Sequence, residues 1–254
     1  MNSLNMAWLV DSWKPSRDKY LRAWQDAGWK ITLWTAGQVD PAAIGVAGVT
    51  VREISELMDA CENRVFLNYE LQHRSHAAAS DLVRFAALYA YGGGYADLDV
   101  LPNRALATMR CSLPTFGKPQ GVPDSIEKYP IFGRPPTAAL SIDKVEIRFV
   151  CSPPRHELLA RIIAQQGRNE LAFMRAGGYA KLGVLNHAQR IVTRTGPAMI
   201  ENVVWMYARE HKRPVSDFLL SAATIDRTPE NDAEHMDARY PEILQAARGW
   251  QIGS

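Results

Sequence analysis

A helical pattern that stops at three consecutive glycines constrains the fold of this chain more than any other sequence feature. Within residues 80–91, Leu82, Phe85, Ala86 and Tyr89 recur at the spacing of one helix face. Gly92-Gly93-Gly94 follows, and glycine adopts the left-handed conformations that end helices at little cost. The segment 95–101 (YADLDVL) then alternates as a strand does. The sequence therefore predicts a helix capped by Ser80 or Asp81, a glycine break and a strand.

The first 35 residues predict a strand, a helix and a second strand. The apolar stretch Met6–Val10 is typical of a buried strand, and residues 18–27 carry apolar side chains at helical spacing before Gly28. Trp29–Thr35 alternates and is rich in strand-forming residues. Short links between these segments favour a βαβ unit. We expect an α/β fold with a mostly parallel, Rossmann-type sheet flanked by helices.

The rest of the chain continues this alternation. We expect a strand at Val145–Cys151 and helices at His156–Gln166 and Ala198–Arg209, with a long loop or lid at residues 113–136 and a polar tail at 226–240. No segment resembles a flexible linker. The expected organisation is therefore one domain, 1–254.

Composition and charge limit the functional classes only moderately. The chain has 254 residues, 47% of them hydrophobic and 22% charged, which is ordinary for a globular protein. The 29 basic and 27 acidic residues give a net charge of +2, which supports neither a nucleic-acid nor a membrane-surface partner and excludes neither. A chain of this length folds without a metal, so a metal site here is expected to be catalytic rather than structural.

The predicted location follows from the absence of other signals. No apolar run approaches the ~18 residues that span a bilayer, and the N-terminus does not resemble a secretory signal. The three cysteines are far apart and form no CxxC pair, which fits a reducing compartment. We expect a cytoplasmic protein, or an effector exported by a signal that the sequence does not reveal.

Two carboxylates two residues apart are the first candidates for chemistry. On the expected strand, Asp97 and Asp99 point to the same face and Leu98 to the opposite, buried face. Neighbouring carboxylates repel one another unless a cation lies between them or one is protonated. A hard divalent ion, Mg²⁺ or Mn²⁺, suits such oxygen ligands. The alternative is a pair of solvated acids on an exposed strand.

Asp81 and Arg84 lie one turn apart on the preceding helix. They are either an ordinary ion pair at helical spacing or an aspartate and an arginine directed at a polar ligand beside the two carboxylates.

The 23 residues from Ser80 to Pro102 (SDLVRFAALYAYGGGYADLDVLP) closely resemble the DXD core of sugar-region glycosyltransferases with the GT-A fold. This group includes yeast-type α-mannosyltransferases, bacterial capsule glycosyltransferases and the glucosylating domains of large clostridial toxins. Ser12–Trp34, with Trp8 before it, resembles the N-terminal pattern of the group, and Thr195-Gly196-Pro197 matches a turn seen near the end of many members.

The resemblance implies roles for particular residues. Asp99 would bind the metal directly, and Asp97 would contact both the metal and the donor ribose. Asp81 and Arg84 would hold the hydroxyls of the donor sugar. Tyr95 would line the nucleotide pocket, and Trp8 would stack on or flank the base. His235 is the nearest candidate for a third metal ligand, with a solvated loop histidine as the alternative.

The resemblance implies a metal-dependent retaining transferase. A hexose would move from a nucleoside-diphosphate sugar, with UDP-sugars favoured and Mn²⁺ or Mg²⁺ as cofactor, to a glycan, protein or other acceptor, as in polysaccharide biosynthesis or effector action. Residues 1–105 would form the nucleotide-sugar half and residues 106–254 the acceptor and closing half. The alternatives are a metal-dependent phosphoesterase or nuclease, which normally needs more acids and histidines, and a non-catalytic nucleotide-sugar-binding module.

Overall fold

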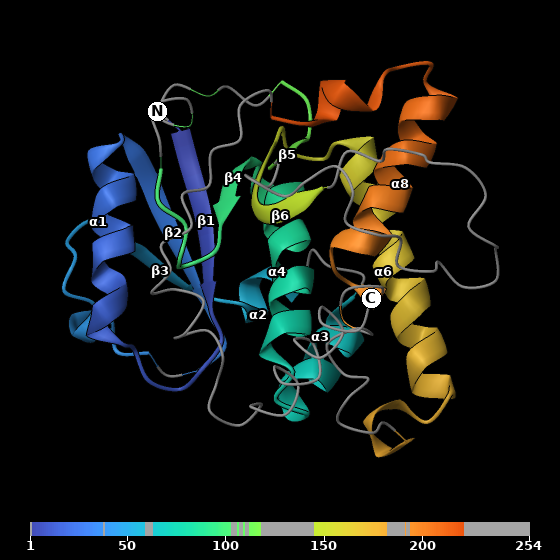
Figure 1. Ribbon diagram of the computed structural model, residues 1–254. Helices are drawn as coiled ribbons and strands as arrows, with labels where there is room; N and C mark the ends of the chain where they lie inside the picture. Colours follow the sequence, from blue (N-terminus) through green and yellow to red (C-terminus); the bar gives the residue numbers. More distant parts are fainter. Residues whose placement is uncertain are drawn as a thin grey trace, which may run out of the picture.

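The computed structural model describes residues 2–37, 39–58, 63–102, 112–117, 145–181 and 194–220, with the single residues 106, 109 and 191. Six strands in this part of the chain form one sheet in the order β3-β2-β1-β4-β6-β5 (Figure 1). In chain order, the strands are β1 (Asn2–Trp8), β2 (Trp29–Thr35), β3 (Thr50–Glu53), β4 (Gly93–Ala96), β5 (Thr115–Gly117) and β6 (Glu146–Ser152).

The sheet is mixed, with parallel pairing on one side and antiparallel pairing on the other. Strand β1 runs parallel to β2 and β4, and β2 runs parallel to β3. Strand β6 is antiparallel to both β4 and β5. The expectation of a mostly parallel sheet is therefore confirmed, and the antiparallel edge is an addition that the sequence pattern did not predict.

Helices cover both faces of the sheet. Helix α1 (Asp18–Asp26) packs on β2, and α4 (His76–Tyr91) packs on β1 and β4 from the other side (Figure 1). A further layer follows, because α6 (Glu157–Arg175) packs on α4 and α8 (Pro197–Glu210) packs on α6. The short helices α2 (Ser55–Met58) and α3 (Arg64–Gln72) also contact α4.

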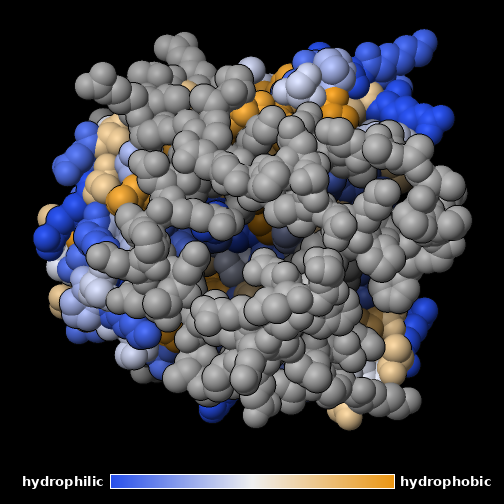
Figure 2. Space-filling model, viewed as in Figure 1, coloured by the Kyte–Doolittle hydropathy of each residue, from blue (hydrophilic) through white to orange (hydrophobic). Residues whose placement is uncertain are grey.

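Side chains alternate in direction along each strand, so the core lies on both faces of the sheet. Leu4 and Met6 of β1 share a buried cluster with Leu21 and Trp24 of α1. Trp34 of β2 faces the other way and packs in the cluster that contains residues of α4. The outer side of α1 is polar, and hydrophilic residues gather over it at the left edge of Figure 2. Helix α1 thus has the single apolar face that its sequence predicts.

Helix α4 is longer and more deeply buried than its pattern suggests. The helix begins at His76, four residues before the expected cap at Ser80, and the capping position is Ser75. Both Ser80 and Asp81 lie inside the helix. The apolar residues of α4 divide between two core clusters, because the sheet covers one side of the helix while α3 and α6 cover others. Because α4 is covered on several sides, its polar residues Asp81 and Arg84 are buried even though they lie outside the predicted apolar face of the helix.

The glycine break joins α4 to β4 through a conformation that only glycine adopts easily. Gly92 ends the helix with φ +66°, and Gly93 follows with φ +82°. Asn5 of β1 fixes the break from the side, because its amide nitrogen donates to the carbonyl oxygens of Gly92 and Gly94 at 3.2 and 3.1 Å. The Asn5 side-chain oxygen accepts a hydrogen bond from the indole of Trp34 at 3.0 Å. The break therefore sets the direction in which β4 leaves the helix.

A side chain at Gly93 is expected to destabilise the protein severely. A Cβ atom there would collide with the backbone oxygen of Ser3 and would require a strained positive φ. We expect Gly93→Val to lower the free energy of unfolding by more than about 3 kcal/mol in a denaturant titration. Gly28→Ala is the control, because Gly28 has φ +87° but open space around it, and should cost about 1–2 kcal/mol. Equal losses would show that the collision with Ser3 is unimportant.

Three further findings bear on the expectations from the sequence. Cys151, buried on β6, is disulfide-bonded, which the sparse cysteine count did not predict. Among the described residues, no helix is long and apolar enough to cross a membrane. The expected loop at 113–136 lies almost wholly outside the described residues, and the polar tail at 226–240 lies entirely outside them.

Candidate active site

The candidate site lies where β1 and β4 end. These strands run parallel with Asn5 opposite Tyr95, so their carboxyl ends meet at one edge of the sheet. Trp8 is the last residue of β1, and Asp97 directly follows β4. The carboxyl edge of an open α/β sheet is the usual place for a ligand. Trp8 and Asp97, far apart in sequence, thus come together at this edge of the sheet.

The two aspartates occupy a turn rather than a strand. Strand β4 ends at Ala96, and the Val100 amide donates to the Asp97 carbonyl at 3.1 Å, so residues 97–100 turn. The expected strand over 95–101 is therefore wrong beyond Ala96. Leu98 is nevertheless buried in the core, as the alternation had suggested. The geometry of Asp97 and Asp99 depends on this turn and not on the two-residue repeat of a strand.

Two side chains from the N-terminal region explain why a turn forms here. Arg17 of the 3₁₀-helix Pro15–Arg17 donates from its guanidinium to the Leu98 carbonyl at 3.2 Å. The indole of Trp24 donates to the Val100 carbonyl at 2.8 Å. Both donors are buried, and buried carbonyl groups need such partners. The sequence pattern of residues 95–101 does not contain this information, because the partners lie more than 70 positions earlier.

Arg84 connects the helix to the turn through two carboxylates. Its guanidinium contacts Asp81, one turn earlier on α4, and lies 2.7 Å from a carboxylate oxygen of Asp97. The Arg84 side chain is only 3% exposed. The ion pair at helical spacing is therefore present, but it is buried, and the same arginine also pairs with an acid from a separate element. The structure brings together three of the residues expected to form the site.

Tyr95 supports Arg84 from β4. The Arg84 guanidinium lies 4.8 Å from the centre of the Tyr95 ring, a cation–π geometry. The Tyr95 hydroxyl pairs with the Ser80 hydroxyl at 2.9 Å. Tyr95 is 1% exposed, so its position in the site is beside Arg84 and within the core.

Burial and charge shift the ionisation of these groups in a consistent way. Burial raises the pKa of Asp81 to about 6, against the lowering by Arg84 and by a hydrogen bond from Thr195. Burial alone would lower the pKa of Arg84, but the carboxylates of Asp97 and Asp81 outweigh it and raise the pKa further. Burial also raises the pKa of Tyr95. At neutral pH the arrangement is therefore a cation between two carboxylates.

Trp8 lies at the same edge with its ring partly exposed. Its indole packs edge-on against Trp13, with ring centres 5.2 Å apart, and its N–H donates to the Ser12 carbonyl at 3.0 Å. These contacts fix the ring plane. Aromatic faces held in this way suit a nucleobase.

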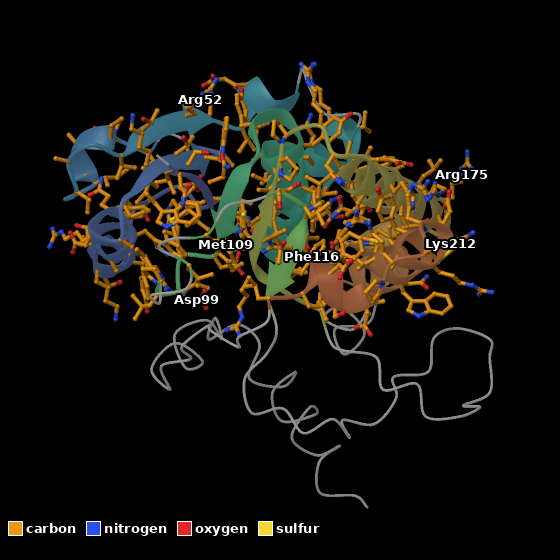
Figure 3. All side chains as sticks on the ribbon, turned by 90° about the horizontal axis from the view of Figure 1, so that it is seen from above. Arg52, Asp99, Met109, Phe116, Arg175 and Lys212 are labelled. Atoms are coloured by element: carbon orange, nitrogen blue, oxygen red, sulfur yellow. The ribbon has the colours of Figure 1, made fainter. Side chains whose placement is uncertain are left out.

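The oxygen ligands of two described aspartates suit a hard divalent cation. Asp97 and Asp99 offer oxygen ligands on one four-residue turn, and Asp99 lies at the margin of the described residues, on the side opposite Arg52 (Figure 3). Mg²⁺ in proteins is commonly held by one or two carboxylates together with substrate phosphates and water. Within the ranges that the structure describes, no group of three or more His, Cys, Asp or Glu residues is arranged for a metal. His235 lies outside the described residues.

Two residues in contact with the site were not assigned a role from sequence. Arg17 holds the turn that carries the aspartates, and Thr195 donates from its hydroxyl to Asp81 at 3.1 Å. Arg17 has no local signal, because its partner lies 81 positions away. Thr195 belongs to the Thr195-Gly196-Pro197 turn, and that resemblance was the available signal.

Comparison with known proteins gives an independent indication. Residues 11–115 match the family model described as the glycosyltransferase sugar-binding region containing the DXD motif. This range includes the Ser80–Pro102 segment, and the suspected resemblance is thereby confirmed. No curated protein sequence matches the chain.

Solved structures are similar in fold at low sequence identity. The UDP-bound glycosyltransferase domain from the YGT toxin has a TM-score of 0.59 and 10% identity, over 93% of this chain and 82% of that one. The ligand-free form of the same domain has a TM-score of 0.57 and 10% identity, over 89% and 80%. PaToxG glycosyltransferase has a TM-score of 0.56 and 9% identity, over 82% and 69%. These likenesses confirm the GT-A-like α/β fold. The family-model match over residues 11–115 and this fold together support a glycosyltransferase enzyme with a DXD sugar-binding region.

Proposed function

We propose that the protein is a metal-dependent, retaining hexosyltransferase that uses a UDP-sugar. The observation that carries the proposal is the buried bridge from Asp81 through Arg84 to Asp97, which ends on the turn that also presents Asp99. A carboxylate and a guanidinium suit sugar hydroxyls, and two further carboxylate oxygens suit a cation that neutralises a diphosphate. The UDP bound to the similar YGT toxin domain supports UDP as the nucleotide.

Each residue has a part in the proposed complex. Asp97 and Asp99 hold the divalent cation, which would supply Lewis-acid neutralisation of the departing diphosphate. Asp81 and Arg84 hold the sugar hydroxyls. Tyr95, for which the resemblance implies a place at the nucleotide pocket, is buried and supports Arg84 from the core. Trp8 stacks on or flanks the base. His235 remains our candidate for a third metal ligand.

The proposed transfer needs no covalent nucleophile from the protein. The bond between the anomeric carbon and the diphosphate oxygen breaks, and the electron pair leaves with the diphosphate. The acceptor oxygen forms its bond on the same face of the sugar, and its proton passes to the departing phosphate oxygen. Retention of configuration follows from this front-face geometry. The role of the protein is to orient both substrates and to stabilise the charge that develops.

The acceptor in this proposal is a hydroxyl-bearing glycan, protein or other molecule. The similarity in fold to toxin domains is compatible with an effector that acts in the cytoplasm. Surface-polysaccharide synthesis is the other setting. The nucleotide-sugar half would span residues 1–105 and the acceptor and closing half residues 106–254, with contacts such as Thr195 to Asp81 between them.

A donor screen tests the proposal. Purified protein is incubated with UDP-glucose, UDP-galactose or GDP-mannose, with Mn²⁺ or with a chelator, and the released sugar is identified by mass spectrometry. Slow hydrolysis of one donor that requires Mn²⁺ supports the proposal. Binding without hydrolysis would favour a non-catalytic module. Cleavage of unrelated phosphodiesters without sugar selectivity would favour a phosphoesterase.

Donor turnover is expected to fall below about pH 6. The pKa of Asp81 is raised to about 6, so the carboxylate needed for the sugar is protonated as the pH falls through that value. The contribution of Asp81 to the free energy of unfolding should instead rise as the pH falls. The folded pKa exceeds the ordinary value of 3.8, so between about pH 4 and 6 the folded state binds more protons at this residue than the unfolded state does. That contribution raises the free energy of unfolding as the pH falls.

Rate measurements and thermal melts across pH 5 to 8 check this expectation. The result would contradict it if turnover stayed constant to pH 4.5, or if turnover fell only because the protein unfolded.

A further inference from the structure

Asp81 receives a hydrogen bond from the second half of the chain. The Thr195 hydroxyl donates to the Asp81 carboxylate at 3.1 Å, on the oxygen that does not face Arg84. Thr195 is 0% exposed and Asp81 is 6% exposed, so water does not compete for this bond. A buried carboxylate with one partner on each oxygen has a fixed plane. Thr195 thus determines how the Asp81 carboxylate is turned.

Two side chains of α6 hold the backbone at Thr195 and at the residue before it. The Gln166 amide nitrogen donates to the Thr195 carbonyl at 3.2 Å and to the Asp81 carbonyl at 3.3 Å, so one side chain joins both backbones. Asn169, three residues later on α6, donates to the Arg194 carbonyl at 2.9 Å. Gln166 thus fixes the backbone of Thr195 itself, and Asn169 fixes the backbone of the residue before it.

The residue before Thr195 is anchored by buried ionisable side chains. The Arg194 guanidinium lies 2.8 Å from a carboxylate oxygen of Glu170 on α6 and 3.1 Å from one of Glu70 on α3. Both glutamates are 0% exposed. Pro197, two residues after Thr195, begins α8, where its fixed φ suits the first helical position. The Arg194–Pro197 turn therefore has a single position relative to α3, α6 and α8.

We propose that Thr195 is a positioning residue for sugar transfer, whose hydroxyl orients Asp81 toward the donor sugar and whose backbone Gln166 holds in register. This inference rests on the proposed function, because it assigns Asp81 to the sugar of the donor. It goes further by placing the control of Asp81 on the Thr195-Gly196-Pro197 turn, far from the DXD motif. Thr195 touches Asp81 and acts on the substrate only through it.

Three variants test the inference. Thr195→Val removes the hydroxyl and keeps the shape, and Thr195→Ser keeps the hydroxyl. Ser152→Ala is the matched control, because Ser152 is also fully buried and its hydroxyl also donates, to the Pro153 carbonyl at 2.8 Å. Ser152 pairs with Gly93, at the end of β4 away from Asp97. The donor used is the UDP-sugar that the wild-type protein hydrolyses.

The expected result distinguishes an effect on recognition of the donor sugar from an effect on binding of the nucleotide. Thr195→Val should lower kcat/KM for the UDP-sugar by about 10- to 100-fold, the range for loss of a hydrogen bond to a charged group, mainly through a higher KM. Its affinity for UDP with Mn²⁺, measured by calorimetry, should stay within about twofold of wild type, because UDP has no sugar for Asp81 to hold. Thr195→Ser should recover kcat/KM to within about threefold, and Ser152→Ala should retain it.

Other outcomes overturn the inference in distinguishable ways. Wild-type kcat/KM in Thr195→Val, with an active wild-type protein, would refute the role of Thr195 and leave the proposed function standing. Equal losses of UDP affinity and kcat/KM would show that Thr195 supports the fold alone. A wild-type protein that turns over no donor would refute both. If Thr195→Val does not fold, Gln166→Met serves instead, with an expected loss of about 3- to 10-fold in kcat/KM at unchanged UDP affinity, and an unchanged kcat/KM there would also refute the inference.

Discussion

Replacement of Asp99 with asparagine is expected to lower metal-dependent donor turnover by about a thousandfold while leaving the fold intact. Asparagine has nearly the same shape, so the turn at residues 97–100 should be retained. Its neutral amide oxygen is a much poorer ligand for a hard divalent cation than a carboxylate oxygen. Loss of a preorganised charge at the departing diphosphate costs a factor of this order.

The comparison for Asp99→Asn is Asp26→Asn, which removes the same charge at the exposed end of α1. Turnover at saturating Mn²⁺ should be unaffected in that control. Calorimetric titration with Mn²⁺ in the presence of UDP should show weaker binding for Asp99→Asn alone. Undiminished turnover in Asp99→Asn would refute the metal role of this residue, whatever the binding data show.

Replacement of Arg84 with methionine is expected to be the most destabilising single change at the site. The Arg84 side chain is 3% exposed and is paired with Asp81 and Asp97. Its removal leaves two carboxylates near one another without a cation, and breaking a buried pair in this way typically costs about 3–5 kcal/mol. Denaturant titration should show a loss of that size, and donor turnover should be abolished.

Arg161→Met is the matched control for this prediction. Arg161 on α6 also contacts two carboxylates, those of Glu157 and Glu210, but its side chain is 34% exposed. Exposed ion pairs contribute little, so the free energy of unfolding should change by less than about 1 kcal/mol. Similar losses for the two variants would mean that the burial of Arg84 has no energetic importance.

The local elements of this protein could be predicted from sequence because their causes are local. The alternation of β2 and the helical spacing in α1 and α4 depend on neighbours within a few residues, and the glycine break ends α4 where expected. The start of α4 was predicted too late, because serines stand at both positions 75 and 80 and residue type alone does not say which of them precedes the helix.

The geometry of the site could not be predicted because its causes are distant in sequence. The segment YADLDV alternates as a strand does, yet Arg17 and Trp24 bind the carbonyls of Leu98 and Val100 and hold a turn. The two aspartates could therefore be identified from sequence as candidates, but their arrangement could not. Likewise, the spacing of Asp81 and Arg84 indicated an ion pair, and only the packing of α6 on α4 shows that it is buried.

The hydrogen bonds that shape the site span long stretches of chain: 81 positions between Arg17 and Leu98, and 114 between Asp81 and Thr195. Closing such large loops is slow compared with forming helices and tight turns. During synthesis on the ribosome, Asp97 and Asp99 would thus emerge well before the segment that orients Asp81. Full competence to transfer sugar would arrive only once the segment that contains Thr195 has emerged and folded against α4.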